Sequence, residues 1–82
     1  MQNKEDIDVD YLNIMLYNFE HSIKNNLDTV YLGYNIFENN DVIQYWVEKE
    51  NWAITLDILI QGAIDLEEYE FAYEFKNIKE KL

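Results

Sequence analysis

The chain contains no proline and only two glycines, Gly33 and Gly62, among its 82 residues. All-β domains need frequent tight turns, which they usually build with glycine and proline. Helices, in contrast, disfavour both residues in their interiors. This scarcity predicts an all-α fold, which we expect as a compact bundle of four to five short helices.

Length and hydrophobicity allow one small core. The composition is 49% hydrophobic and 16% aromatic, which is too apolar for a disordered chain even at a net charge of −11. A chain of this length supports a single domain, spanning residues 1–82. Residues 1–7 are polar, and we expect them to be frayed.

Helical periodicity marks both ends of the chain. Asp8 or Asp10 is suited to cap a first helix that runs to the stop signal Asn25-Asn26. A capping box of Asp65 and Glu68 is expected to open a last helix that ends near Lys81. The apolar faces of the two helices are, in order, Leu12, Met15, Leu16, Phe19 and Ile23, and Leu66, Phe71, Phe75, Ile78 and Leu82.

The middle of the chain is ambiguous. Residues 28–37 hold β-branched and aromatic side chains that suit a strand, but a lone strand would lack a partner, so a short helix is favoured. Residues 37–41 predict a turn, and Asp41 is a natural cap for a helix to about Lys49. That helix would turn Ile43, Trp46 and Val47 inward.

A further helix is expected from Trp52 to about Ala63, after a tight turn at residues 49–51 in which Asn51 serves as the cap. Its side chains are apolar on nearly every side, which is typical of a buried central helix. Gly62 occupies the place where a helix stop is expected.

Few residues suit catalysis. Cysteine is absent, and His21 and Ser22, the only histidine and serine, are adjacent, so on a helix they point apart. Asp6, Asp8 and Asp10 have the spacing that opens an EF-hand loop, but the required glycine and glutamate are both tyrosines. We therefore expect a protein that is not an enzyme, with no catalytic residues, no cofactor and no metal.

The charge indicates which partners are suitable. A net charge of −11 repels nucleic acid and anionic membranes, and it attracts a basic protein partner. Solubility alone accounts for the charge equally well. The polar N-terminus and the lack of cysteine predict a cytoplasmic protein. All basic residues are lysine, which suggests an AT-rich bacterial or phage genome.

Acidic and tyrosine side chains recur together in two places, and tyrosine is a frequent anchor in protein interfaces. Glu67, Glu70 and Glu74 are spaced to share one helix face. The alternative is a solvated helix face whose tyrosine rings cover the edge of the core. The candidate partner-binding residues are Glu48, Glu50, Glu67, Glu70, Glu74, Tyr45, Tyr69 and Tyr73.

Residues 41–82 resemble the small immunity proteins of bacterial polymorphic toxin systems, especially the MafI type. The matching pattern is Val42, Ile43, Trp46, Glu50, Trp52, Ala53, Leu56 and Leu59. The family usually has glycine before the glutamate and tryptophan directly after it, where this chain has Lys49 and an additional Asn51. The resemblance implies a one-to-one inhibitor of a cognate toxin, often a nuclease, and it transfers no binding residues.

Three hypotheses follow for the function. The first is an immunity-type protein that inhibits a basic toxin enzyme. The second is a phage DNA mimic or anti-defence inhibitor of a host enzyme that binds nucleic acid. The third is a structural or regulatory helical module that forms a homodimer through its aromatic residues.

Overall fold

The first helix begins and ends where the sequence predicts. In the computed structural model, which describes residues 7–82, α1 spans Val9–Lys24, and the Asp8 carboxylate accepts a hydrogen bond from the Tyr11 N–H at 2.8 Å. Beyond Lys24, Asn26 has a φ of 56° and lets the chain turn away. The Leu27 N–H then donates to the Ser22 carbonyl at 2.8 Å, which closes the helix end.

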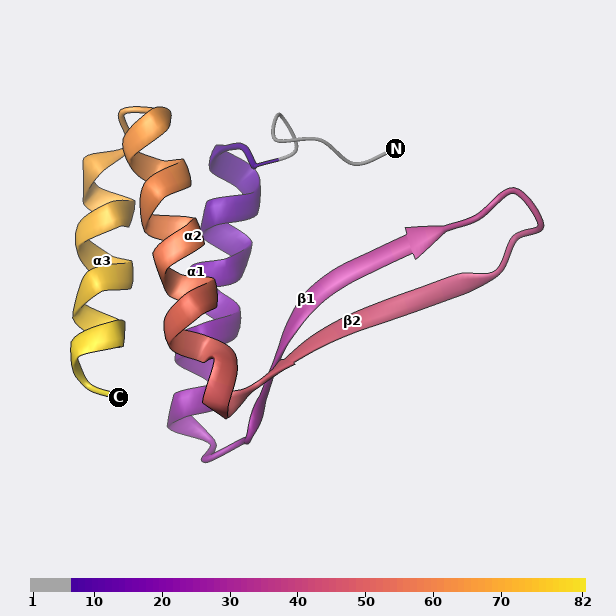
Figure 1. Ribbon diagram of the computed structural model, residues 1–82, viewed down its shortest axis with the longest axis horizontal. Helices are drawn as coiled ribbons and strands as arrows, with labels where there is room; N and C mark the ends of the chain where they lie inside the picture. Colours follow the sequence, from indigo (N-terminus) through magenta and orange to yellow (C-terminus); the bar gives the residue numbers. More distant parts are fainter. Residues whose placement is uncertain (1–6) are drawn as a thin grey trace.

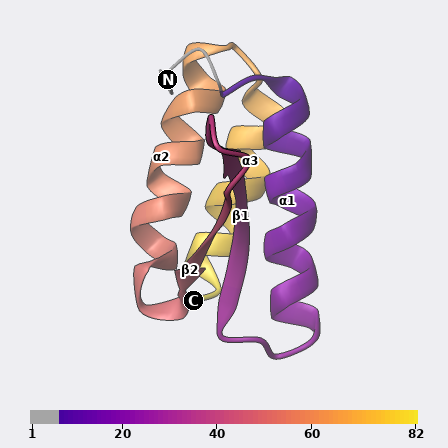
Figure 2. The ribbon, with the colours of Figure 1, turned by 90° about the vertical axis from the view of Figure 1, so that its right-hand side faces the viewer.

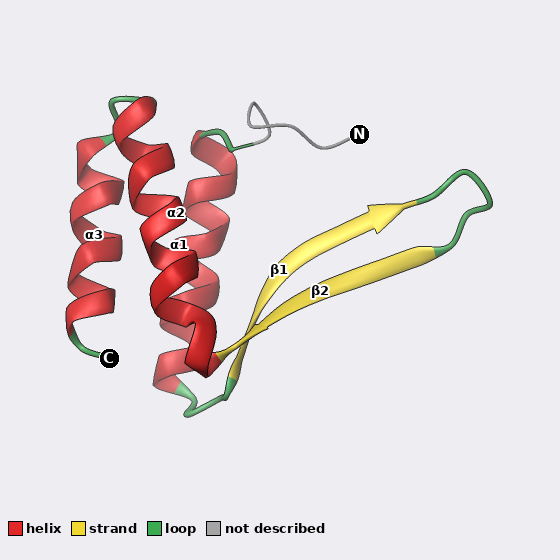
Figure 3. Ribbon diagram, viewed as in Figure 1, coloured by secondary structure: helices red, strands yellow, loops and turns green. Residues whose placement is uncertain are grey.

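The middle of the chain forms an antiparallel β-hairpin, so the prediction of an all-α bundle of four to five helices is wrong. β1 spans Thr29–Ile36 and β2 spans Val42–Glu48 (Figure 3). The partner that β1 seemed to lack is the segment that was expected to be a helix from Asp41 to Lys49. Its β-branched and aromatic residues suit a strand, and pairing overrides the helical spacing.

The expected turn at residues 37–41 is confirmed. The Asn40 N–H donates to the Phe37 carbonyl at 2.8 Å, and Asn40 has a φ of 69°. This is a turn followed by a left-handed residue, a common way to join two strands. Asp41 therefore closes the hairpin and caps no helix. Gly33, with a φ of 137°, lies at an irregularity in the register of β1.

A short 3₁₀ helix, η2, at Lys49–Asn51 leads into α2, which spans Trp52–Asp65, and α3 spans Tyr69–Glu80. Asn51 holds the N-cap position of α2, but its side chain makes no capping bond. Gly62 lies inside α2, so its expected role as a stop is wrong. A Cβ at Gly62 would lie 3.0 Å from Cγ2 of Ile7, so the glycine permits the chain before α1 to pack closely.

The turn between α2 and α3 differs from the expected capping box of Asp65 and Glu68. α2 continues through Asp65, and Glu67 takes the left-handed conformation with a φ of 59°. The Glu68 N–H donates to the Ala63 carbonyl at 2.8 Å, and the Glu67 N–H donates to Ile64 at 2.9 Å. These two bonds form a Schellman motif, which usually has glycine where this chain has Glu67.

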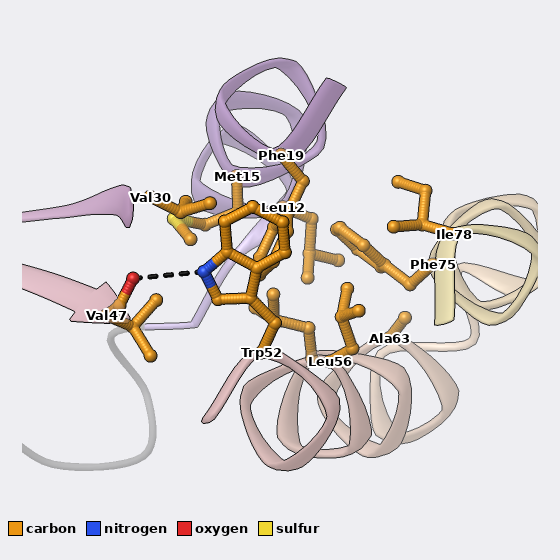
Figure 4. Packing of buried hydrophobic residues seen from close by; sticks show 11 residues of the cluster. Leu12, Met15, Phe19, Val30, Val47, Trp52, Leu56, Ala63, Phe75 and Ile78 are labelled. Atoms are coloured by element: carbon orange, nitrogen blue, oxygen red, sulfur yellow. Dashed lines mark hydrogen bonds between the residues drawn. The ribbon is translucent and has the colours of Figure 1, made fainter. Parts of the chain in front are cut away.

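The three α-helices lie side by side, and the hairpin extends away from one end of them (Figure 1). Trp52, only 1% exposed, fills the space between them and packs edge-to-face on Phe19 (Figure 4). Its indole N–H donates to the Val47 carbonyl at 3.0 Å, which joins the base of the hairpin to the core. The buried hydrophobic residues are Leu12, Met15, Phe19, Val30, Val47, Trp52, Leu56, Leu59, Ala63, Phe75 and Ile78.

Several residues that were expected inside are exposed. Ile23, Leu66 and Leu82 all lie on the surface, because each stands at a helix end where the core stops. The fraying expected for residues 1–7 falls outside the described residues except at Ile7, which packs against the core. Within residues 7–82, no helix combines the length and the hydrophobicity needed to cross a membrane.

Candidate protein-binding site

The predicted partner-binding residues separate into two groups at opposite ends of the helical layer. Tyr69, Glu70, Tyr73 and Glu74 lie exposed on the first half of α3, with Glu67 exposed in the turn before it. Tyr45, Glu48 and Glu50 lie on β2 and η2, where the hairpin joins the helices. Because α3 is on the far side of the helical layer from the hairpin, the structure does not form one surface from both groups (Figure 1).

The predicted acidic stripe on the last helix is only partly correct. Glu70 and Glu74 are four residues apart on α3, so they share a face. Glu67, however, precedes the helix and belongs to the turn. It joins this group through the fold of the turn rather than through helical spacing.

Carboxylates gather at the end of the helical layer where α1 begins, α2 ends and α3 begins (Figure 1). We call this set the acidic end. It consists of Asp8, Asp10, Asp65, Glu67, Glu68, Glu70 and Glu74. The lysines within residues 7–82 instead follow the other ends of these helices: Lys24, Lys49, Lys76, Lys79 and Lys81.

No cation within residues 7–82 compensates the acidic end. The one ion pair in this part of the chain joins Lys79 Nζ to Asp57 at 2.7 Å, on the middle of α2 and the last turn of α3. The Asp65 carboxylate accepts a hydrogen bond from the Gln61 amide at 3.0 Å, a neutral donor that leaves the charge in place. The acidic end therefore presents a concentrated negative charge to solvent.

A groove between α1 and α3 adjoins the acidic end. It is lined by Asn13, Leu16, Glu70, Phe71, Tyr73 and Glu74. Apolar side chains form part of its lining, and two carboxylates, a phenol hydroxyl and the Asn13 amide form its polar part. Such a groove suits a long basic side chain, whose methylene stem packs on apolar surface while its charged head meets a carboxylate.

Helix stability explains only some of these carboxylates. Asp8 and Asp10 lie at the start of α1, where the helix dipole favours a negative charge. Asp65 is the last residue of α2, where the same dipole disfavours a negative charge. Glu67 takes a left-handed backbone conformation, which residues other than glycine and asparagine rarely adopt. Asp65 and Glu67 thus lie where folding alone would prefer other residues.

The hairpin, residues 29–48, forms a second exposed surface, which we call the arm. Only Val30 and Val47 of the arm are buried, and both lie at its base. Beyond them the arm presents apolar side chains to solvent, including Trp46 at 55% exposure. The large exposed apolar residues of the arm are Tyr34, Ile36, Phe37, Val42, Ile43, Tyr45 and Trp46.

The arm is a candidate surface that the helical spacing of residues 41–49 does not predict. A helix from Asp41 would turn Ile43 and Trp46 into the core, whereas the structure exposes both. Only Val47 of that predicted set is buried. The signal that could have found the arm is the run of strand-forming residues on both sides of the turn at residues 37–41.

α2 also exposes apolar surface, although it was expected to be buried on all sides. Trp52, Leu56 and Leu59 face the core, but Ile54 and Ile58 are 63% and 57% exposed. Ile58 belongs to a shallow surface depression that also includes Ile7 and Gly62. Apolar side chains on one face of α2 therefore pack in the core, and those on another face are exposed to solvent.

His21 and Ser22 have structural surroundings. His21 is exposed, and its ring stacks on Tyr17 with centroids 5.9 Å apart. Ser22 is buried, and its hydroxyl donates to the Thr29 carbonyl at 2.8 Å, so it ties α1 to β1. The two side chains therefore have separate partners, His21 on α1 itself and Ser22 on β1. Across residues 7–82, no three acidic or histidine side chains group closely enough to hold a metal ion.

Tyr11 is a titratable residue of α1 that the fold perturbs. Burial raises the pKa of its phenol, because the charged phenolate would lose water. Its hydroxyl donates to the Leu32 carbonyl at 3.2 Å. Tyr11 therefore joins α1 to the arm through this hydrogen bond.

Comparisons with protein-family models, with curated proteins and with solved structures give no match. The surfaces of this chain that suit a protein partner are therefore defined by its own geometry: the acidic end with its groove, and the apolar arm.

Proposed function

We propose that this chain is a non-enzymatic inhibitor of the immunity type, which binds a basic toxin enzyme such as a nuclease through its acidic end. The observation that carries the proposal is the set of uncompensated carboxylates beside the exposed Tyr69 and Tyr73. Two of these carboxylates, Asp65 and Glu67, lie where helix stability does not favour them. The resemblance of residues 41–82 to toxin immunity proteins suggests the same function, although β2 replaces the helix expected for Val42, Ile43 and Trp46.

The acidic end would act in two stages. Its charge would accelerate the encounter with a basic surface, and the rate would fall as salt rises. Tyr69 and Tyr73 would then pack on the partner, since tyrosine supplies a large contact area at a small entropic cost. A nuclease binds phosphate with lysine and arginine, so carboxylates that pair with those side chains would block its substrate. The absence of cysteine is compatible with a cytoplasmic setting for this inhibitor.

The first test is affinity capture of the tagged chain from cells of its source, at low and at moderate salt. We expect one basic partner that remains bound at moderate salt and whose activity on nucleic acid is inhibited by the purified chain. Capture of a partner that has no basic surface, or no inhibition at saturating concentration, would contradict the proposal.

Matched variants then locate the binding surface. Glu70→Gln with Glu74→Gln removes charge beside the groove, and Glu48→Gln with Glu50→Gln removes the same charge at the other end of the helical layer. We expect the first pair to slow association and weaken binding more than tenfold, and the second pair to change binding less than threefold. Equal losses from both pairs would instead favour a DNA mimic, in which acidic groups act over the whole surface.

A further inference from the structure

The arm has little support from the rest of the molecule. β1 and β2 form a two-stranded sheet, and from Gly33 outward nearly all of its side chains are partly or largely exposed. An isolated two-stranded hairpin is at best marginally stable in water. A further strand or a packed surface is usually needed to stabilise such an arm.

Both faces of the arm are apolar. The register pairs Tyr31 with Trp46 on one face, where their rings meet edge-to-face at 4.9 Å, and Ile36 with Val42 also lies on that face. The opposite face carries Val30 and Val47 at the base, followed by the exposed Ile43 and Tyr45. A solvent-facing hairpin would usually show one polar face.

The base of the outer edge of β1 is covered by α1. The Thr29 carbonyl accepts from Ser22 at 2.8 Å, and the Tyr31 carbonyl accepts from the Asn18 amide at 3.0 Å. These bonds use the backbone groups that β1 turns away from β2. The irregularity between Tyr31 and Gly33 further interrupts this edge.

The outer edge of β2 is open. Phe37 and Asp41 form a hydrogen-bonded pair, with the Phe37 N–H donating at 2.9 Å. The alternation of an antiparallel ladder then turns the backbone groups of Val42, Gln44 and Trp46 away from β1. Within residues 7–82, no other strand pairs with this edge.

The β2 edge also lacks the features that usually prevent pairing. Protected edges carry lysine, proline or inward-pointing charges. The arm has neither lysine nor proline, and between Thr29 and Val47 its only charged residues are Glu38 and Asp41, both in the turn. The chain can therefore meet an identical strand without placing charges against each other along the edge.

We propose that two copies of this chain form a dimer in which their β2 strands pair antiparallel, which produces a four-stranded sheet. A twofold axis makes this contact self-complementary. A basic partner fits this edge less well, because between Val42 and Val47 the strand offers it no carboxylate. The arm leaves the helical layer at the end away from the acidic end, so each copy would keep its carboxylates available (Figure 1).

The arm offers substantial apolar area to such a dimer. Aromatic side chains bury about 150–250 Å² each, so Tyr34, Phe37, Tyr45 and Trp46 at roughly half exposure present on the order of 300–500 Å² per copy. Two copies approach the ~1,000 Å² of a specific interface before aliphatic residues are counted. α2 lies on the β2 side of the arm (Figure 2), and it also exposes the apolar side chains of Ile54 and Ile58.

The test uses the purified full chain in sedimentation equilibrium from about 1 μM to 1 mM, a range that covers weak and moderate dimers. We expect the mass of a dimer at the upper concentrations. Gln44→Lys places a lysine on the pairing edge and should raise the dissociation constant of the dimer at least tenfold. Asn77→Lys adds the same charge on α3, on the far side of the helical layer from the arm, and should leave the dimer unchanged.

A second measurement does not depend on a variant. Amide hydrogen exchange should show protection of Val42, Gln44 and Trp46, whose N–H groups would face solvent in a monomer. A strict monomer with rapid exchange at these amides would overturn the proposal, as would a dimer that Gln44→Lys and Gln44→Pro leave intact. Protection that arises only when a basic protein is added would assign the edge to that partner instead.

Discussion

Replacement of Glu67 by glycine should stabilise the protein, although it removes a charged residue from the candidate site. Glu67 is the left-handed residue of the Schellman motif, with a φ of 59°. A residue with a Cβ loses roughly 1–2 kcal/mol in this conformation. Glycine removes that strain, but it also increases the conformational entropy of the unfolded chain, which lowers the free energy of unfolding by about 0.4–1 kcal/mol. The expected net gain is about 0.5–1 kcal/mol.

Two control variants separate the effect of backbone strain on stability from the effect of the Glu67 charge. Glu67→Gln removes the charge and keeps the Cβ, so it should recover little of the gain. Asn26→Gly changes the same position of the motif at the end of α1, where φ is 56°. Because asparagine tolerates the left-handed region, this change should give at most a few tenths of a kcal/mol.

Urea unfolding followed by tryptophan fluorescence measures the effect. With a slope near 1 kcal/mol per molar urea, Glu67→Gly should raise the midpoint by about 0.5–1 M without a change in slope. If Glu67→Gln gives the same gain as Glu67→Gly, charge and not backbone strain determines the stability of this turn. If Asn26→Gly gives as much as Glu67→Gly, the reasoning from the left-handed conformation is refuted.

Three further perturbations test the packing. Trp52→Ala should lower the free energy of unfolding by about 3–5 kcal/mol, since it empties the centre of the core and removes the hydrogen bond to Val47. A loss below about 1 kcal/mol in urea unfolding would contradict the burial of Trp52. Gly62→Ala should leave the free energy of unfolding almost unchanged in the same assay, because the new Cβ meets Ile7. In an Ile7→Ala background, the same substitution should raise the free energy of unfolding by about 1 kcal/mol. Equal effects in both backgrounds would exclude the contact. The raised pKa of Tyr11 means that the folded state favours the neutral phenol, so its contribution to stability is complete below about pH 10 and is lost as pH rises through the folded pKa. Tyr11→Phe should therefore reduce the alkaline loss of stability, and an unchanged pH profile would count against that shift.

The sequence predicted the helices at both ends because their signals are local. Asp8 caps α1 and Asn26 ends it, and the buried Leu12, Met15 and Phe19 follow helical spacing. Trp52 was correctly placed at the start of a helix with its side chain in the core. Each of these features depends on residues within a few positions of one another.

The hairpin could not be predicted in the same way, because a strand is defined by a partner elsewhere in the chain. Residues 28–37 were recognised as compatible with a strand, but Ile43, Trp46 and Val47 also fit a helical spacing and were assigned to a helix. The choice between these alternatives depends on the pairing of β1 with β2, which neither segment shows alone. The scarcity of glycine and proline was misleading, since asparagine supplies the left-handed residue of the hairpin turn.

The candidate site was predicted residue by residue but not as a surface. Exposed Glu70, Tyr73 and Glu74 on α3 follow from helical spacing. The contributions of Asp8 and Asp65 depend on how α1, α2 and α3 are aligned, and this alignment is a property of the tertiary fold. Spacing also cannot place Glu48 and Glu50 at the opposite end of the helical layer from Glu70 and Glu74.

The chain enters and leaves the arm at adjacent points. The Lys49 N–H donates to the Asp28 carbonyl at 2.8 Å, so the ends of the arm are tied together beside the helices. An insertion closed in this way can change in length or sequence with little effect on the path of α1 into α2. Related chains could thus keep one helical body and diverge in the arm, so that each recognises its own copies and excludes those of its relatives.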